Sequence, residues 1–148
     1  MRILPKSGSV INCYTDGSTR EGHSGASVVM VSMPPHNEHF LIGVVGYYMG
    51  EESSPIMAEL YAMKLALCEI ISLDSNPRHL RICSDCQSAV DLVIGNSTSD
   101  IDRINDILEE IDELVEKLIK VEFQWVRGHN GNQYNEIADS VAYSCAQG

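Results

Sequence analysis

The sequence contains few basic residues. Lysine and arginine together number 10, against 21 aspartate and glutamate residues, and the formal net charge at pH 7 is -11. An acidic surface repels the phosphate backbone of a nucleic acid and gains no affinity from the release of counterions. Taken alone, the charge argues against a nucleic-acid partner and indicates a role in keeping the protein soluble.

Long apolar runs are also lacking. No segment approaches the length of a membrane-spanning helix. The first ten residues, MRILPKSGSV, contain no apolar stretch long enough for a signal peptide. We therefore expect a soluble intracellular protein, cytoplasmic or nuclear, with no membrane partner.

The five cysteines do not form a metal-binding pattern. Cys83 and Cys86 make one CxxC pair, but no second pair completes a zinc site. Cys13 and Cys83 lie among strand-forming residues, so we expect them to be small buried side chains.

Apolar, β-branched segments dominate the first third of the chain. Three of them, at residues 10–15, 26–32 and 40–49, predict strands joined by short connections, which is an antiparallel meander. The stretch STREGHSG, residues 18–25, is expected to be a loop. The 148 residues are expected to form a single domain over 1–148, and the 44% hydrophobic content supplies its core.

After residue 54, apolar residues recur every three or four positions, which is the spacing of helices. Shorter apolar segments between them predict two more strands. Helices are expected at residues 55–73, 87–94, 101–118 and 134–145, and strands at 79–84 and 120–126. This order predicts an α/β fold: a five-stranded mixed sheet, with the antiparallel meander first and then parallel strands, and helices on both faces.

Four acidic residues need an explanation. Asp16 follows the first strand, Asp85 follows the fourth, Glu59 lies near the start of the first long helix and Asp139 lies in the last helix. Each has an ordinary structural explanation. These are a turn residue for Asp16, a helix cap for Asp85, a charge near a helix N-terminus for Glu59 and a solvated helix residue for Asp139. If the first and fourth strands pair in parallel, however, Asp16 and Asp85 lie side by side at an edge of the sheet where α/β folds bind ligands.

Clustered carboxylates repel one another, and burial raises their pKa values. A hard divalent cation such as Mg²⁺ removes that penalty and prefers oxygen ligands. Two such ions about 4 Å apart can activate a water molecule and stabilise the leaving oxygen of a phosphodiester. An acidic site therefore does not exclude a phosphate substrate.

Four motifs resemble the type 1 ribonuclease H family, in that family's order and over about residues 10–145. They are YTDGS at 14–18, AEL at 58–60, CSD at 83–85 and GHNGNQYNEIAD at 128–139. The resemblance implies a ribonuclease H-like fold and endonucleolytic hydrolysis of the RNA strand of an RNA–DNA hybrid, with two Mg²⁺ or Mn²⁺ ions per site. Membership of the retroelement or reverse-transcriptase type within this family stays open.

The resemblance also implies roles for individual residues. Asp16, Glu59, Asp85 and Asp139 match the four metal-binding acids of the family. His129 matches its mobile-loop histidine, which helps to shuttle protons or release product, and a histidine titrates near neutral pH. The alternative for His129 is an ordinary surface-loop histidine.

Residues that would hold the hybrid match the family less closely. Pro55 and Ile56 stand where many members carry polar side chains, and neither can make a side-chain hydrogen bond. Ser53 and Ser54 can still hold a phosphate or a 2′-hydroxyl group. The expected substrate-binding residues are Gly17, Ser18, Ser53, Ser54 and Asn135.

Residues 100–118 take the place of the basic helix and loop of many bacterial relatives. Residues 100–116 contain eight acids and one base, Arg103. The segment therefore cannot bind the phosphates of DNA through a cluster of basic side chains. We favour a solvated acidic face on a helix that packs on the core. The alternative is a helix that docks a polymerase or another protein, because Ile107 and Leu114 widen the apolar stripe.

Three functions remain open from the sequence. The first is a metal-dependent ribonuclease H, which we expect to bind hybrid weakly and to be most active at low salt. The second is a non-catalytic hybrid-binding or scaffold module of a larger polymerase assembly, which would be expected to lose carboxylates. The third is another nuclease or transposase of the same broad fold, which would not require His129.

Overall fold

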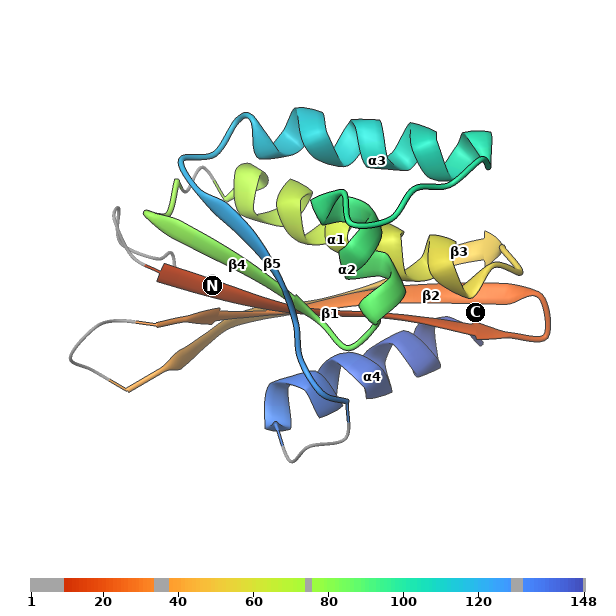
Figure 1. The fold of residues 1–148 in the computed structure, drawn as a ribbon. Coiled ribbons are helices and arrows are strands. Elements are labelled where there is room, and N and C mark those ends of the chain that lie inside the picture. Colours follow the sequence, from red (N-terminus) through yellow and green to blue (C-terminus); the bar gives the residue numbers. More distant parts are fainter. Residues whose placement is uncertain (1–9, 34–37, 74–75, 129–131, 148) are drawn as a thin grey trace.

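The computed structural model describes residues 10–33, 38–73, 76–128 and 132–147 (Figure 1). Within these residues the strands and helices follow one another in the order predicted. The elements are β1 (Val10–Arg20), β2 (His23–Ser32), β3 (Phe40–Glu51), α1 (Pro55–Ser72), β4 (His79–Ser84), α2 (Gln87–Ile94), α3 (Asp102–Val115), β5 (Val121–Trp125) and α4 (Gln133–Cys145). None of these helices combines the length and the hydropathy needed to cross a bilayer.

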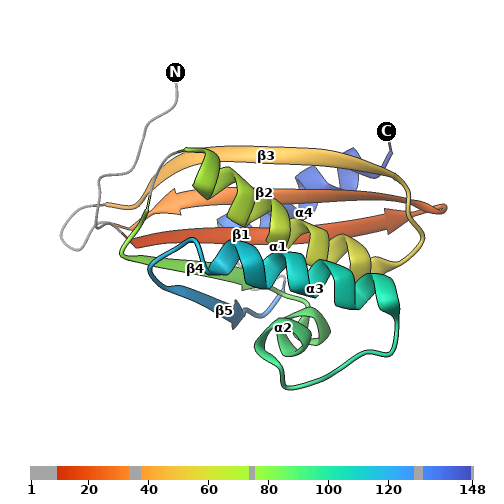
Figure 2. The same cartoon turned by 90° about the horizontal axis from the view of Figure 1, so that it is seen from above.

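The five strands form one mixed sheet in the order β3-β2-β1-β4-β5. β1, β2 and β3 pair antiparallel, and β4 and β5 extend the sheet in parallel from β1. Helices α1, α2 and α3 lie over one face and α4 lies over the other (Figures 1 and 2). The predicted fold class is therefore confirmed.

Side chains that alternate along β1 divide the core between the two faces of the sheet. Ile11 and Cys13 contact the cluster beneath α1, whereas Tyr14 belongs to a smaller cluster beneath α4 that also contains Cys83. Cys13 and Cys83 are both buried, as expected. Burial raises the pKa of both thiols, which makes them unreactive at neutral pH.

The hairpin between β1 and β2 differs from the prediction. Residues 18–25, expected to be a loop, continue both strands up to a two-residue turn at Glu21 and Gly22. These two residues have φ angles of 51° and 79°, and a tight hairpin turn of type I′ requires positive φ at both positions. The prediction was wrong because this part of the hairpin is polar and lacks the apolar pattern of a strand. The hydroxyl groups of Thr19 and Ser24 form a hydrogen bond of 2.7 Å across it.

Helix α3 packs its apolar side on the core. Ile104, Ile107 and Ile111 are buried in the cluster beneath α1, and Leu114 packs against it. The extra apolar residues that suggested a docking helix are therefore already used within the fold. The acidic residues remain on the outer side, as in the interpretation that we favoured.

Candidate active site

Two of the predicted acids lie where β1 and β4 separate. The parallel pairing of these strands ends at Thr15 and Ser84, and Asp16 and Asp85 are the next residues of each chain segment. β4 stops there, while β1 continues and pairs with β2 alone. Asp16 thus lies within β1, not after it, but the expected meeting of Asp16 with Asp85 at this edge of the sheet is confirmed.

Glu59 reaches the same edge from α1. The helix begins at Pro55, whose fixed φ suits a first helical position, and the Ser54 side chain accepts a hydrogen bond from the Met57 amide. Gly17 lets the helix approach β1 closely, because a Cβ atom at Gly17 would lie 2.4 Å from the carbonyl carbon of Ala58. The Gly17 amide donates to Glu59 Oε1 at 2.8 Å.

The three acids form a compact cluster. One carboxylate oxygen from each of Asp16, Glu59 and Asp85 lies within 4.8 Å of the other two. Asp16 is 5% exposed and Glu59 is 8% exposed. Ser84 contributes a hydroxyl group that donates to Glu59 Oε2 at 3.4 Å.

Asp139 comes to the cluster from the opposite face of the sheet, on α4. The Ser27 hydroxyl donates to the carbonyl oxygen of Ala138, and Ser27 pairs directly with Asp16 in the β1–β2 ladder. Asp139 then hydrogen-bonds to the carboxyl group of Asp16. The compact cluster therefore contains three of the four predicted acids, and Asp139 adjoins it through Asp16 from the other face of the sheet.

Burial sets the electrostatics of this cluster. Burial, then the charge of Glu59 and the charge of Asp85, raise the pKa of Asp16 well above its ordinary value. Burial also raises the pKa of Glu59, although hydrogen bonds from Asp16 and the Gly17 amide oppose the shift. Two charges so close and so poorly hydrated repel, which favours the protonated forms of these carboxyl groups.

A donor set made only of carboxylate oxygens fits a hard divalent cation. Such a cation would offset the repulsion among the carboxylates of Asp16, Glu59 and Asp85. The chemistry of the residues therefore suits Mg²⁺ or Mn²⁺ better than a soft metal, which prefers sulfur and imidazole ligands.

The predicted histidine, His129, lies outside the described residues. The residue before it, Gly128, lies against the cluster: a Cβ atom at Gly128 would be 2.8 Å from Asp85 Oδ2. The chain therefore enters the segment that contains His129 directly beside Asp85.

The predicted substrate-binding residues have different surroundings. Ser53 is exposed, and Gly17 and Ser18 are partly exposed at the cluster's end of β1. Asn135, in contrast, is 3% exposed, and its Oδ1 atom has no hydrogen-bond partner among the described residues. Substrate contact by these residues stays a prediction.

Two hydroxyl groups near the cluster were not anticipated. Ser84 orients Glu59, and Ser27 fixes the α4 backbone beside Asp139. Both are fully buried polar residues among strand residues. A serine within an apolar strand, directly before an acid in the case of Ser84, is the signal that could have pointed to them.

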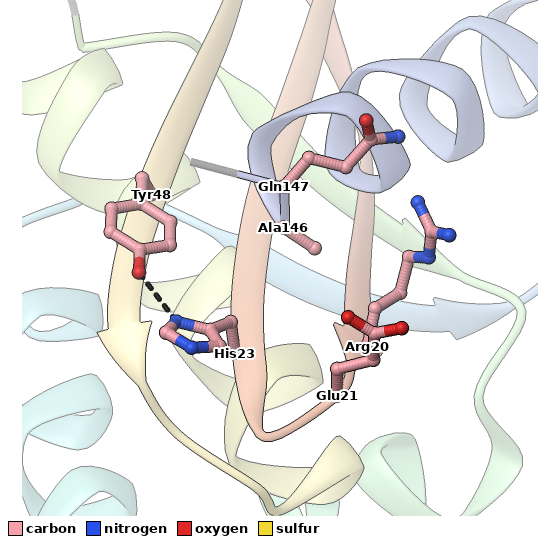
Figure 3. A pocket seen from close by; sticks show the side chains of 6 residues that line it. All are labelled: Arg20, Glu21, His23, Tyr48, Ala146 and Gln147. Atoms are coloured by element: carbon pink, nitrogen blue, oxygen red, sulfur yellow. Dashed lines mark hydrogen bonds between the residues drawn. The ribbon is translucent and has the colours of Figure 1, made fainter.

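A pocket at the far end of the hairpin is separate from the acids (Figure 3). His23 Nδ1 and the Tyr48 hydroxyl group form a 2.6 Å hydrogen bond there, and Arg20 lies over the Tyr143 ring with its guanidinium carbon 4.2 Å from the ring centre. The lining residues are Arg20, Glu21, His23, Tyr48, Ala146 and Gln147. None of the four clustered acids belongs to it.

Solved structures of low sequence identity share this fold. RNase H1 from the halophilic archaeon Halobacterium salinarum NRC-1 superposes with a TM-score of 0.76 at 18% identity, over 93% of this chain and 98% of that chain. LC11-RNase H1, isolated from compost and solved with an RNA/DNA hybrid, gives 0.74 at 16% identity, over 93% and 96%. The foamy viral protease-reverse transcriptase, solved with RNA/DNA hybrid, gives 0.71 at 14% identity, over 99% of this chain and 21% of that chain.

Sequence comparison assigns the family. No curated protein sequence matches the chain significantly. The model of the RNase H family matches residues 8–147, which is nearly the whole sequence. The chain therefore belongs to the RNase H family.

Proposed function

We propose that this chain is a metal-dependent endonuclease that hydrolyses the RNA strand of RNA–DNA hybrids by a two-metal-ion mechanism. The convergence of Asp16, Glu59 and Asp85 at the end of the β1–β4 pairing carries the proposal, with Asp139 hydrogen-bonded to Asp16. Membership of the RNase H family and the likeness to LC11-RNase H1, solved with a hybrid, support the substrate class.

In this mechanism Asp16, Glu59, Asp85 and Asp139 would hold two Mg²⁺ or Mn²⁺ ions. When bound, these ions lower the pKa of an attacking water molecule and stabilise the charge on the leaving oxygen of the phosphodiester. The surrounding residues keep the Glu59 carboxylate in place before substrate binds. The Gly17 amide and the Ser84 hydroxyl group each donate a hydrogen bond to one of its oxygens. Such preorganised ligands do not need to rearrange during the reaction.

His129 exchanges protons with the reacting groups near neutral pH in this proposal. The position of Gly128, the residue before His129, beside Asp85 supports this role. Ser18, Ser53 and Ser54, together with Gly17 and Asn135, are proposed to contact the substrate. Serine hydroxyl groups can donate to a phosphate or pair with the 2′-hydroxyl group that distinguishes RNA from DNA.

A cleavage assay tests this function. The protein is incubated with labelled RNA–DNA hybrid, double-stranded RNA and single strands, with Mg²⁺, Mn²⁺ or a chelator. We expect metal-dependent cleavage of the RNA strand of the hybrid, lost in Asp16→Asn and kept in Glu113→Gln, which removes an exposed acid outside the cluster. Cleavage that persists in Asp16→Asn, or a hybrid that stays intact under every condition, would contradict the proposal.

The second candidate is a non-catalytic hybrid-binding or scaffold module of a larger polymerase assembly. The likeness to foamy viral protease-reverse transcriptase favours it, because the similar part is only 21% of that chain. The retention of all four carboxylates favours the enzyme. Hybrid binding by the wild-type protein, without cleavage in either metal, would establish the second candidate instead. In either role we propose that residues 1–148 act as one domain and that residues 100–118 contact a polymerase or another protein through their exposed acidic side chains.

A further inference from the structure

The only base in the acidic segment 100–116 is paired with the connection between β3 and α1. Arg103 Nη1 and Nη2 donate to Glu52 Oε1 and Oε2 at 2.6 and 2.9 Å. A guanidinium group that meets a carboxylate with two parallel hydrogen bonds is more strongly oriented than a single-contact ion pair. The Glu52 side chain is 12% exposed and the Arg103 side chain is 54% exposed, so only the carboxylate side of the pair is shielded from solvent.

Glu52 in turn organises the residues around it. Its Oε2 atom accepts a hydrogen bond from the Ser54 amide at 3.1 Å, and its backbone carbonyl accepts one from the Ser24 hydroxyl group at 2.6 Å. Hydrogen bonds from Arg103 and from the backbone of Ser54 and Ser53 lower the pKa of Glu52, against the opposing effect of burial. Without Arg103, a largely covered carboxylate would lose its countercharge, which destabilises its present position.

The connection that Glu52 organises leads directly to the proposed active site. Ser53 is exposed, and Ser54 caps α1 through the Met57 amide, five residues before Glu59. The helix itself is anchored independently, because Leu60, Met63 and Leu67 are fully buried. Loss of Arg103 should therefore disturb the connection much more than the position of Glu59.

We infer that Arg103 is a positioning residue: by holding Glu52, it fixes the connection Glu52–Ser54 in the conformation that receives the substrate. The acidic helix α3 thus contributes to substrate affinity through its one basic side chain, without contacting the substrate. This inference rests on the proposed function, which supplies its substrate. How rigidly the Glu52–Ser54 connection is held can nevertheless be measured without any cleavage.

The structure offers a matched control for this pair. Lys64 Nζ of α1 and Glu110 Oε2 of α3 form another ion pair that involves α3, at 2.8 Å. Its side chains are 29% and 51% exposed, and it lies away from the connection. Lys64→Gln therefore removes an ion pair that holds α3 to α1 and leaves the contact of α3 with Glu52 unchanged.

Steady-state cleavage of hybrid is measured for the wild-type protein, Arg103→Met, Glu52→Gln, their double variant and Lys64→Gln. We expect KM to rise about tenfold in both single variants with kcat changed less than about twofold, because ground-state positioning is lost while the chemistry is kept. The double variant should have the KM of the single variants, since both changes break one interaction. Arg103→Lys should lie in between, because lysine keeps the charge but not the paired hydrogen bonds.

Two outcomes would overturn the inference. If Arg103→Met raises KM and Glu52→Gln does not, Arg103 acts on the substrate directly. If Lys64→Gln raises KM as much as Arg103→Met, the effect is a general loosening of α3 against α1.

Amide hydrogen exchange of residues 52–57 separates this inference from the proposed function. We expect faster exchange in Arg103→Met and Glu52→Gln, and unchanged exchange in Lys64→Gln. This result would support the positioning role even if the wild-type protein cleaved no hybrid, which would refute only the proposed function. Unchanged exchange in all variants would refute the positioning role.

Discussion

Asp16 is the residue on which the carboxylate cluster depends, because Glu59 and Asp139 both hydrogen-bond to it. Burial and the neighbouring acids raise its pKa, so the folded protein binds this proton more tightly than the unfolded chain does. The resulting stability is fully present below the ordinary carboxyl pKa of about 4. It is lost as the pH rises through the raised pKa of the folded state.

We therefore expect Asp16→Asn to stabilise the cation-free protein at about pH 8 but not at about pH 4. The asparagine has no proton to take up on folding, so the cost of protonating this carboxyl group at pH 8 disappears. A gain of about 1–2 kcal/mol would raise Tm by roughly 3–6 °C. Calorimetry in the presence of a chelator measures this, and Glu113→Gln serves as the control. Equal effects at both pH values would show that the raised pKa of Asp16 is not the cause.

Among the elements, α1 and β1 approach one another most closely at Gly17. A Cβ atom there would lie 2.4–2.6 Å from backbone atoms of Ala58 and Glu59, which cannot move without shifting the helix. Gly43, in β3, offers a contrast: a Cβ atom there would meet only the end of the Met30 side chain, at 3.4 Å.

We expect Gly17→Ala to destabilise the protein by about 1–3 kcal/mol through overpacking and to reduce cleavage, because Glu59 moves with α1. Gly43→Ala should be close to neutral or slightly stabilising, since Ala restricts the unfolded chain more than Gly does. Urea unfolding and cleavage assays compare the two variants. A Gly17→Ala protein with wild-type activity would mean that the distance between α1 and β1 does not limit the site.

The same elements show what the sequence could predict. Helix α1 and the strands around it carry strong apolar patterns, and the position of Asp16 beside Asp85 followed from parallel pairing alone. The polar half of the β1–β2 hairpin has no such pattern, so its strands were predicted to end too early. The pairing of Arg103 with Glu52 joins residues 51 positions apart, and only the packing of α3 on α1 determines it.

The whole molecule carries a net charge of -11, and this charge limits how a nucleic acid can bind. Contacts between a phosphate backbone and the few basic groups are weakened as salt screens them. We expect weak hybrid binding and cleavage that declines as monovalent salt rises from about 20 to about 150 mM at constant Mg²⁺. Rates that stay constant over this range would argue against electrostatic limits on binding.

The turn at Glu21 and Gly22 has a consequence beyond the hairpin that it closes. Turn geometry fixes strand register, and a shift of one residue moves every side chain of a strand to the other face of the sheet. In such a shifted pairing Asp16 would no longer lie opposite Ser27, the residue that holds α4 beside it. The assembly of acids from β1, α1, the end of β4 and α4 therefore depends on two residues at the far end of the hairpin that take no part in the chemistry.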